Sequence, residues 1–177
     1  MTTQMTSLAY ESPVGTLTLV GDGERLTRIL FPDQQAPAPT GDPGHLAVAA
    51  EQLNEYFAGG RTEFDLPIRL GGTQFHRRVW EGLLQIPYGA TTTYGTLAKK
   101  LPDSGEQPFE PRAIGSGVGA TPIPIVVPCH RVIGADGSLT GYRGGLDLKR
   151  KLLNFEASGG DAAAFDSGWQ SGQLSLA

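Results

Sequence analysis

Residues 123–134 read Ile-Pro-Ile-Val-Val-Pro-Cys-His-Arg-Val-Ile-Gly and contain Cys129, the only cysteine of this 177-residue chain. The β-branched run at 125–127 predicts a short buried strand. Pro128 ends this predicted strand, because proline has no N–H group to donate to a strand ladder. We therefore expect Cys129 at the exit of the strand, just beneath the protein surface.

Cys129 has two interpretations. A lone cysteine is commonly a small buried hydrophobe with an inert thiol. The neighbouring His130 favours a nucleophile instead, because an imidazole can draw the proton from a thiol. Adjacent side chains of an extended segment point to opposite faces, so an indirect relay through a water is favoured over a direct hydrogen bond.

Glu156 is a candidate for the third member of this relay. It stands at the end of a predicted helix with an apolar face, in the run Leu-Leu-Asn-Phe-Glu at 152–156. A carboxylate there would accept a hydrogen bond from His130 and make the imidazole a better base. Taken alone, a charge at a helix end is more commonly a solvated one.

Several motifs stand in the order found in one protein family. The run Pro-Cys-His-Arg-Val at 128–132 resembles the active-site motif of the O6-alkylguanine-DNA alkyltransferases, also called methylated-DNA-protein-cysteine methyltransferases. The family order also holds for Thr-Tyr-Gly at 93–95, Arg-Ala-Ile-Gly at 112–115, Gly-Tyr-Arg-Gly-Gly at 141–145 and Leu-Leu-x-x-Glu at 152–156. The resemblance spans about residues 7–157 and is strongest from Phe75 onward.

The resemblance implies a suicide DNA-repair enzyme, which takes the alkyl group of O6-alkylguanine, and of O4-alkylthymine, onto Cys129 once per molecule. It implies no cofactor and no metal ion. The implied catalytic residues are Cys129, His130, Glu156 and Tyr94. The implied contacts to the extruded base come from Val132, Arg143, Tyr142, Lys149 and Thr121. The implied contacts to DNA come from Arg112, Ala113, Gly115, Ser116 and Arg131.

The implied partner is double-stranded DNA that carries the lesion. The resemblance implies that a helix enters the minor groove and that Arg112 fills the gap left when the guanine swings out. Extrusion agrees with the chemistry, because a thiol cannot reach an O6-alkyl carbon inside the base stack. A monomer is expected in solution, and cooperative assembly on DNA is left open.

The chain is predicted to divide near Gly71-Gly72. Residues 1–70 are predicted to form an α/β support lobe with a small antiparallel sheet, ribonuclease-H-like in type, because a hairpin pattern at 16–31 precedes helical spacing at 46–57. Residues 71–157 are predicted to form a mainly α lobe for DNA binding and alkyl transfer, with a winged-helix-like helix-turn-helix. Residues 158–177 are rich in Gly, Ala and Ser and are predicted to be a disordered tail.

Capping residues predict where the helices of the second lobe begin. Thr73 is expected to cap a helix that buries Val79 and Trp80, and Thr93 a short helix through Leu101. Pro111 suits the first position of the second helix of the helix-turn-helix. The segment 113–119 is rich in glycine and forms helix poorly, so a loop-like connection is the alternative. Small side chains there would let the backbone approach a narrow groove.

The net charge of −4 is unevenly distributed. Residues 1–70 carry four basic and nine acidic side chains, whereas residues 71–157 carry ten basic and seven acidic ones. The basic excess in the second lobe suits modest contact with phosphates, although an ordinary mixed surface would show the same balance. No apolar run has membrane-spanning length and the first residues do not resemble a signal peptide, so a cytoplasmic location is expected.

Three other functions remain open. A non-transferring lesion sensor of the same fold would usually lack the cysteine. A helix-turn-helix regulator with a structural thiol would leave the Cys-His-Glu set unexplained. A cysteine hydrolase is poorly served by adjacent Cys129 and His130, because a dyad needs both side chains to face each other.

Two features depart from the family pattern. Thr121 stands where the family usually has asparagine, which predicts a looser cysteine loop or a slower transfer, because a hydroxyl lacks the reach of an amide. The connection at 102–110 is longer than usual and acidic, and we predict a mobile loop at the edge of the DNA surface.

Overall fold

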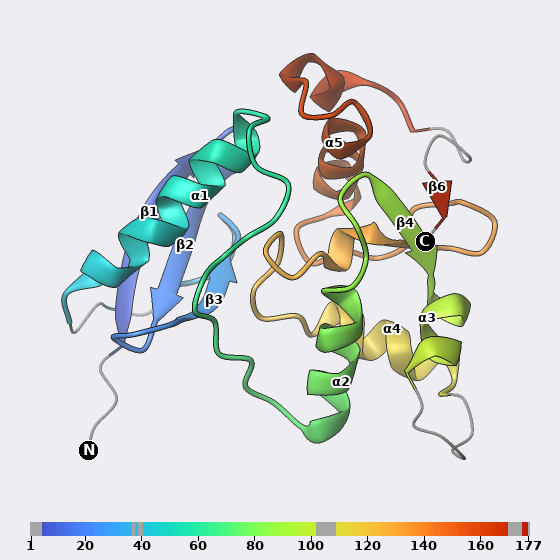
Figure 1. Cartoon of the computed structure of the whole chain (residues 1–177), viewed down its shortest axis with the longest axis horizontal. Coiled ribbons are helices and arrows are strands. Elements are labelled where there is room, and N and C mark those ends of the chain that lie inside the picture. The colour runs from blue at the N-terminus through green and yellow to red at the C-terminus, as the bar shows by residue number, and fades with distance from the viewer. Residues whose placement is uncertain (1–4, 37, 39–40, 102–108, 170–174, 177) are drawn as a thin grey trace. The chain divides into compact units, whose positions relative to one another are not determined.

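The computed structural model describes residues 5–36, 38, 41–101, 109–169 and 175–176. The chain forms two compact units, Met1–Gly71 and Gly72–Ala177 (Figure 1). The small antiparallel sheet predicted for the first unit and the mainly helical second unit are both confirmed. No helix in the described part of the chain has the length and apolar character needed to cross a lipid bilayer.

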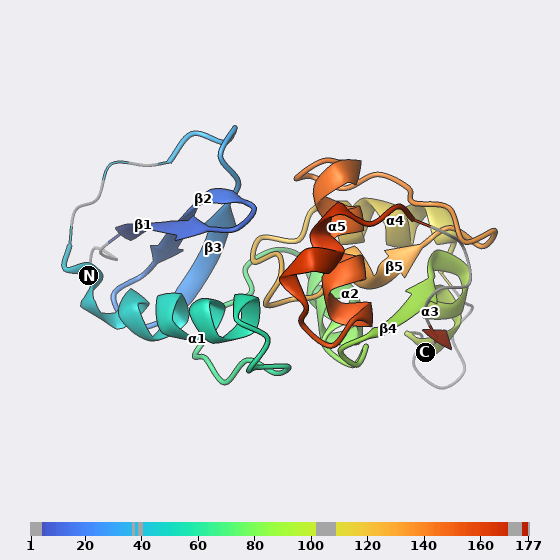
Figure 2. The same cartoon turned by 90° about the horizontal axis from the view of Figure 1, so that it is seen from above.

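The N-terminal unit is a three-stranded antiparallel sheet with one long helix along it (Figure 2). Its strands are β1 (Thr6–Ser12), β2 (Gly15–Gly21) and β3 (Leu26–Leu30), and η1 (Pro43–Leu46) leads into α1 (Ala47–Phe57). The predicted β2–β3 hairpin is confirmed, whereas β1 was not predicted. Apolar side chains from the sheet and helix, such as Leu17, Leu19 and Leu53, are fully buried. This unit has its own core.

In the described part of the C-terminal unit, four α-helices accompany short strands. The helices are α2 (Gln74–Leu83), α3 (Tyr94–Lys100), α4 (Pro111–Gly119) and α5 (Leu146–Ala157). The strands β4 (Ala90–Thr93), β5 (Val132–Ile133) and β6 (Ser175–Leu176) pair in parallel, with β4 in the middle. The short helices are η2 (Cys129–Arg131) and η3 (Ala162–Asp166).

The predicted helix starts are confirmed by their capping bonds. The Thr73 hydroxyl accepts from the His76 N–H at 3.1 Å, and the Thr93 hydroxyl accepts from the Thr96 N–H at 3.1 Å. Pro111 occupies the first turn of α4, so the segment 113–119 is a helix rather than a loop. Residues 102–108 of the predicted mobile connection lie outside the described residues.

The weak helix α4 is held by close packing on α2. A Cβ at Gly117 would lie 3.0 Å from Val79, so the missing side chain lets the two helices approach. The Trp80 indole N–H donates to the Gly117 carbonyl at 2.9 Å, and both groups are buried. Trp80 is therefore a core residue, as predicted, and tertiary packing compensates for the poor helix propensity of α4.

The strand predicted at 125–127 is wrong. Ile125 has a φ of 73°, which a β-branched residue rarely adopts, and the Val127 N–H donates to the Ile123 carbonyl at 2.9 Å. A second tight turn follows at Pro128, where the Cys129 N–H donates to the Val127 carbonyl at 2.7 Å. Pro124, Pro128 and these turns thus stand in place of the predicted strand. Cys129 is the first residue of the 3₁₀-helix η2.

The predicted disordered tail also differs from the structure over residues 158–169. The helix η3 packs on α5, where the rings of Phe155 and Phe165 stack with centroids 4.8 Å apart. The Asn154 amide donates to the Ser167 carbonyl at 2.7 Å, and the Trp169 indole donates to the Gly137 carbonyl at 2.9 Å. Residues 170–174 and 177 lie outside the described residues.

Candidate active site

Cys129 occupies the first position of η2 and is 5% exposed. Cys129 lies between the turn at Pro128 and the 3₁₀-helix, and its side chain points inward. Neither element has the alternating side-chain geometry of a strand. The expectation of an extended segment at Cys129 and His130 is therefore wrong, whereas the indirect relay between them stays a prediction. The predicted position of the thiol beneath the surface agrees with its burial.

His130, Arg131 and Glu156 form a buried charged cluster, which we call the His-Arg-Glu cluster. The His130 Nε2 lies 2.8 Å from Glu156 Oε2. Arg131 donates from Nε to Glu156 Oε1 at 2.7 Å and from Nη2 to Oε2 at 3.0 Å. Its remaining nitrogen, Nη1, donates to the Ile86 carbonyl at 2.7 Å. The carboxylate predicted to orient His130 is thus itself fixed by a two-point ion pair.

The His-Arg-Glu cluster sets the protonation of its own members. Burial alone raises the pKa of Glu156, but His130 and the Arg131 guanidinium together bring it down to about 2, so the carboxylate is ionised. Burial lowers the pKa of His130, against the opposing effect of Glu156. A neutral imidazole then donates from Nε2–H to Glu156 and keeps its lone pair on Nδ1. Nδ1 has no hydrogen-bond partner among the described residues and is free to act as a base.

Burial also dominates the electrostatics of the thiol. It raises the pKa of Cys129 to about 11, while a hydrogen bond with the Thr121 side chain and the charge of Lys149 act in the opposite direction. The Lys149 side chain is fully buried, and burial lowers its pKa to about 8, so it is still protonated at neutral pH. The resting thiol is therefore protonated, and it needs a base to become a nucleophile.

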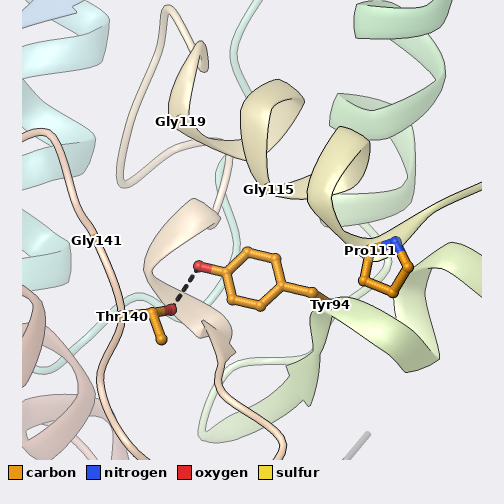
Figure 3. Close-up of a pocket in the computed structure, with 6 residues that line it drawn as sticks. All are labelled: Tyr94, Pro111, Gly115, Gly119, Thr140 and Gly141. Carbon is orange, nitrogen blue, oxygen red and sulfur yellow. Dashed lines mark hydrogen bonds between the residues drawn. The ribbon is translucent and has the colours of Figure 1, made fainter.

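A pocket of about 420 Å³ lies between α4 and the loop that precedes α5. Figure 3 shows the Tyr94 ring along this pocket, with its hydroxyl directed at Thr140. The Thr140 hydroxyl donates to the Tyr94 oxygen at 2.8 Å. The other lining residues are Pro111, Gly115, Gly119 and Gly141. Glycines leave space on the walls of this open, mostly apolar depression.

One face of α4 is exposed and nearly free of bulk. Arg112, Ala113 and Ser116 are exposed, whereas Ile114 and Val118 are buried. Arg112 is the one long side chain on this exposed face. Gly115 lies next to the Tyr94 ring, where an added Cβ would be in ordinary van der Waals contact with the ring at 3.7 Å. The helix therefore presents its backbone to the outside and seats Tyr94 beneath it.

The remaining predicted base contacts are distributed around the thiol. The Thr121 hydroxyl donates to the Val118 carbonyl at 2.6 Å, in the turn that ends α4. Val132 is buried, and its N–H donates to the Cys129 carbonyl. Burial, together with the neighbouring Cys129, raises the pKa of the Tyr142 phenol. The exposed Arg143 donates to the Gly119 carbonyl at 3.3 Å.

The structure corrects one predicted residue and adds another. Arg131 was predicted to contact DNA, but its side chain is 7% exposed and is bound to Glu156 and the Ile86 carbonyl. Its position directly after His130 in the sequence gave no sign of a partner 25 residues away. Thr140 was not predicted, although it directly precedes the Gly-Tyr-Arg motif at 141–143. Its contact with Tyr94 depends on the fold and has no sequence pattern of its own.

Comparisons with known proteins follow the same two units. Residues 6–70 match the model of the 6-O-methylguanine DNA methyltransferase ribonuclease-like domain, and residues 74–158 match that of the DNA binding domain of the same name. The methylated-DNA--protein-cysteine methyltransferase of Mycobacterium tuberculosis is 49% identical over 152 residues, which cover 84% of this chain and 90% of that protein. The protein of the same name from Methanosarcina acetivorans is 42% identical over 154 residues, covering 84% of this chain and 96% of its own length.

A solved structure is similar over nearly the whole fold. The crystal structure of Mycobacterium tuberculosis OGT in complex with DNA superposes with a TM-score of 0.81 at 46% identity, covering 90% of this chain and 98% of that one. Both matched domains, the identity and the coverage lead to one assignment. This chain belongs to the 6-O-methylguanine DNA methyltransferase family.

Proposed function

We propose that this chain repairs alkylated DNA by moving the alkyl group of O6-alkylguanine, and of O4-alkylthymine, irreversibly onto Cys129. The family and its relatives supply the reaction class. The observation that carries the assignment to this chain is the buried Cys129 thiol next to a neutral His130 held by Glu156. A structural cysteine would not need a base with an ionised orienting carboxylate.

Activation of the thiol begins at His130. Nδ1 takes the thiol proton, through one water as the family resemblance implies, and Glu156 stabilises the imidazolium that forms. Lys149 supports the thiolate with its positive charge. A thiolate is required because the neutral thiol is a weak nucleophile and burial keeps it protonated at rest.

Transfer is a single displacement. The sulfur–carbon bond forms as the carbon–oxygen bond to guanine breaks, and the electron pair of that bond stays on the guanine. A hydrogen bond from the Tyr94 hydroxyl supports this leaving group, and the proton lost by the thiol finally resides on the restored guanine. The product is S-alkylcysteine. No described residue is placed to cleave the new thioether, so each molecule acts once.

Access to the base requires extrusion from the duplex. We assign entry into the minor groove to α4, because its exposed face is nearly flat apart from Arg112. Arg112 fills the gap in the stack, and the backbone next to Ala113, Gly115 and Ser116 approaches the strands. Double-stranded DNA with the lesion is the partner, and we propose that the protein works as a monomer in the cytoplasm.

The test is the mass of the protein after incubation with a duplex that contains one O6-methylguanine. We expect a gain of one methyl group, located by peptide mapping to the peptide that contains Cys129, together with unmodified guanine in the DNA. The Cys129→Ala variant should gain nothing. A lesion sensor or a regulator would leave the wild-type mass unchanged, and methylation of any other residue would contradict the proposal.

A further inference from the structure

Thr140, which lines the pocket, makes two different contacts. Its side-chain hydroxyl donates to the Tyr94 oxygen at 2.8 Å, as the dashed line in Figure 3 marks. Its backbone carbonyl accepts from the Lys149 ammonium at 3.0 Å. Thr140 thus contacts both the Tyr94 phenol, which is proposed to support the leaving guanine, and the Lys149 ammonium, which is proposed to support the thiolate.

The direction of the Thr140–Tyr94 hydrogen bond matters. A phenol oxygen can accept one hydrogen bond and donate another. When the Thr140 hydroxyl donates to the Tyr94 oxygen, the hydrogen of Tyr94 is not used in this contact and is left for a ligand in the pocket. Burial raises the pKa of Tyr94, so the phenol keeps this hydrogen at neutral pH.

Two neighbours position the Tyr94 ring. Tyr94 is the first residue of α3, and its ring lies beside Gly115, where an added Cβ would be in ordinary van der Waals contact with it at 3.7 Å. The far end of the ring is fixed only by Thr140 among the hydrogen bonds of the described residues. The loop position of Thr140 is in turn fixed by the fully buried Lys149.

We propose that Thr140 is a positioning residue for alkyl transfer: it orients the Tyr94 hydroxyl so that the phenol donates to the leaving guanine. This inference rests on the proposed function and adds a residue to it. Thr140 itself does not react. Its hydroxyl holds the donor in place before the carbon–oxygen bond breaks, which lowers the cost of arranging that donor during the reaction.

The test compares Thr140→Val, which keeps the shape but loses the hydroxyl, with Thr140→Ser, which keeps the hydroxyl. Single-turnover transfer is measured at saturating lesion DNA. We expect Thr140→Val to be slower by about tenfold, as for one lost hydrogen bond in the transition state, and Thr140→Ser to recover most of the rate. Thr16→Val is the matched control, because it also loses a side-chain hydrogen bond, to Glu11, in the N-terminal unit.

A comparison with and without the Tyr94 hydroxyl separates a positioning role of Thr140 from a merely structural one. In a Tyr94→Phe background there is no phenol to orient, so adding Thr140→Val should slow the transfer no further. Equal fold losses in both backgrounds, or a wild-type rate for Thr140→Val, would overturn the inference. If wild-type protein transfers no alkyl group at all, the proposed function fails instead, so the two failures are distinguishable.

Discussion

The His-Arg-Glu cluster and the exposed face of α4 belong to the same unit but are built in opposite ways. In the cluster, three ionisable side chains are buried and bound to one another at 2.7–3.0 Å. On the face of α4, Arg112, Ala113 and Ser116 are exposed, and only Arg112 is long. Charge is concentrated where water is excluded, whereas the face that we propose for contact with DNA has little side-chain bulk.

The difference separates two tasks. A general base needs a fixed neighbour in a low dielectric, where ion pairs and hydrogen bonds are strong but a missing partner is costly. A surface that enters a groove needs shape and one inserted side chain, and it can change without unfolding the protein. Substitutions in the cluster should therefore alter stability and rate together, whereas substitutions on α4 should alter DNA handling alone.

Glu156→Gln should have the largest effect. It removes the charge that offsets Arg131 inside the protein, so we expect the free energy of unfolding to fall by about 3–5 kcal/mol and transfer to be nearly lost. Urea denaturation and single-turnover assays measure the two effects. Asp147→Asn on the same helix is the control, because Asp147 is exposed and its ion pairs with Arg150 and Lys151 should contribute little. Equal losses of stability in Glu156→Gln and Asp147→Asn would contradict the special role of the buried charge in the His-Arg-Glu cluster.

Acid should weaken the His-Arg-Glu cluster through Glu156. The pKa of this carboxyl is lowered from 4.5 to about 2 in the fold, so its contribution is complete above about pH 4.5 and is lost as the pH falls towards 2. The shift corresponds to about 3 kcal/mol. We expect the stability difference between wild type and Glu156→Gln to shrink as urea denaturation is repeated from about pH 6 down to about pH 3. A constant difference over this range would contradict the ionised cluster.

Arg112→Ala should leave the melting temperature unchanged, because the side chain is exposed on α4. Transfer from duplex DNA should slow by about tenfold, as expected for the loss of one inserted side chain of roughly 1.4 kcal/mol. Transfer from the free base should not change. Arg28→Ala, at an exposed position of β3, is the control and should behave as wild type. A drop in stability for Arg112→Ala would remove the distinction between the two regions.

Thr121→Asn should have the smallest effect. Thr121 joins the two regions, since its hydroxyl bonds the Val118 carbonyl at the end of α4 and also contacts the thiol. An amide offers both a donor and an acceptor for this turn. We expect transfer to be a few-fold faster and the melting temperature slightly higher. No change in either quantity would count against a looser cysteine loop in this chain.

Local chemistry predicted the helix starts and the contact of His130 with Glu156, but not the other contacts of the site. Thr73, Thr93 and Pro111 mark helix starts because capping depends on neighbouring residues. The β-branched run at 125–127 indicated a strand, yet flanking prolines and the positive φ of Ile125 produce turns instead. Strand propensity reflects residue type alone and does not include such a tertiary constraint.

Long-range pairs were beyond sequence reasoning in a similar way. Arg131 follows His130 directly and looked like a DNA contact, but its position is decided by Glu156 on α5. Thr140 became a site residue only when the fold brought it to Tyr94. The relay of Cys129, His130 and Glu156 was predicted from the chemistry of the three residue types, and the family resemblance then implied their catalytic roles. The catalytic roles of these three residues stay predictions until alkyl transfer is measured.

The most direct test of the account counts lesions. A fixed amount of protein is titrated with excess duplex that carries O6-methylguanine, and restored guanine is quantified over time. We predict a plateau at one lesion per protein molecule, because the alkyl group stays on Cys129. Continued repair beyond this plateau, or any repair by Cys129→Ser, would contradict irreversible transfer to this thiol.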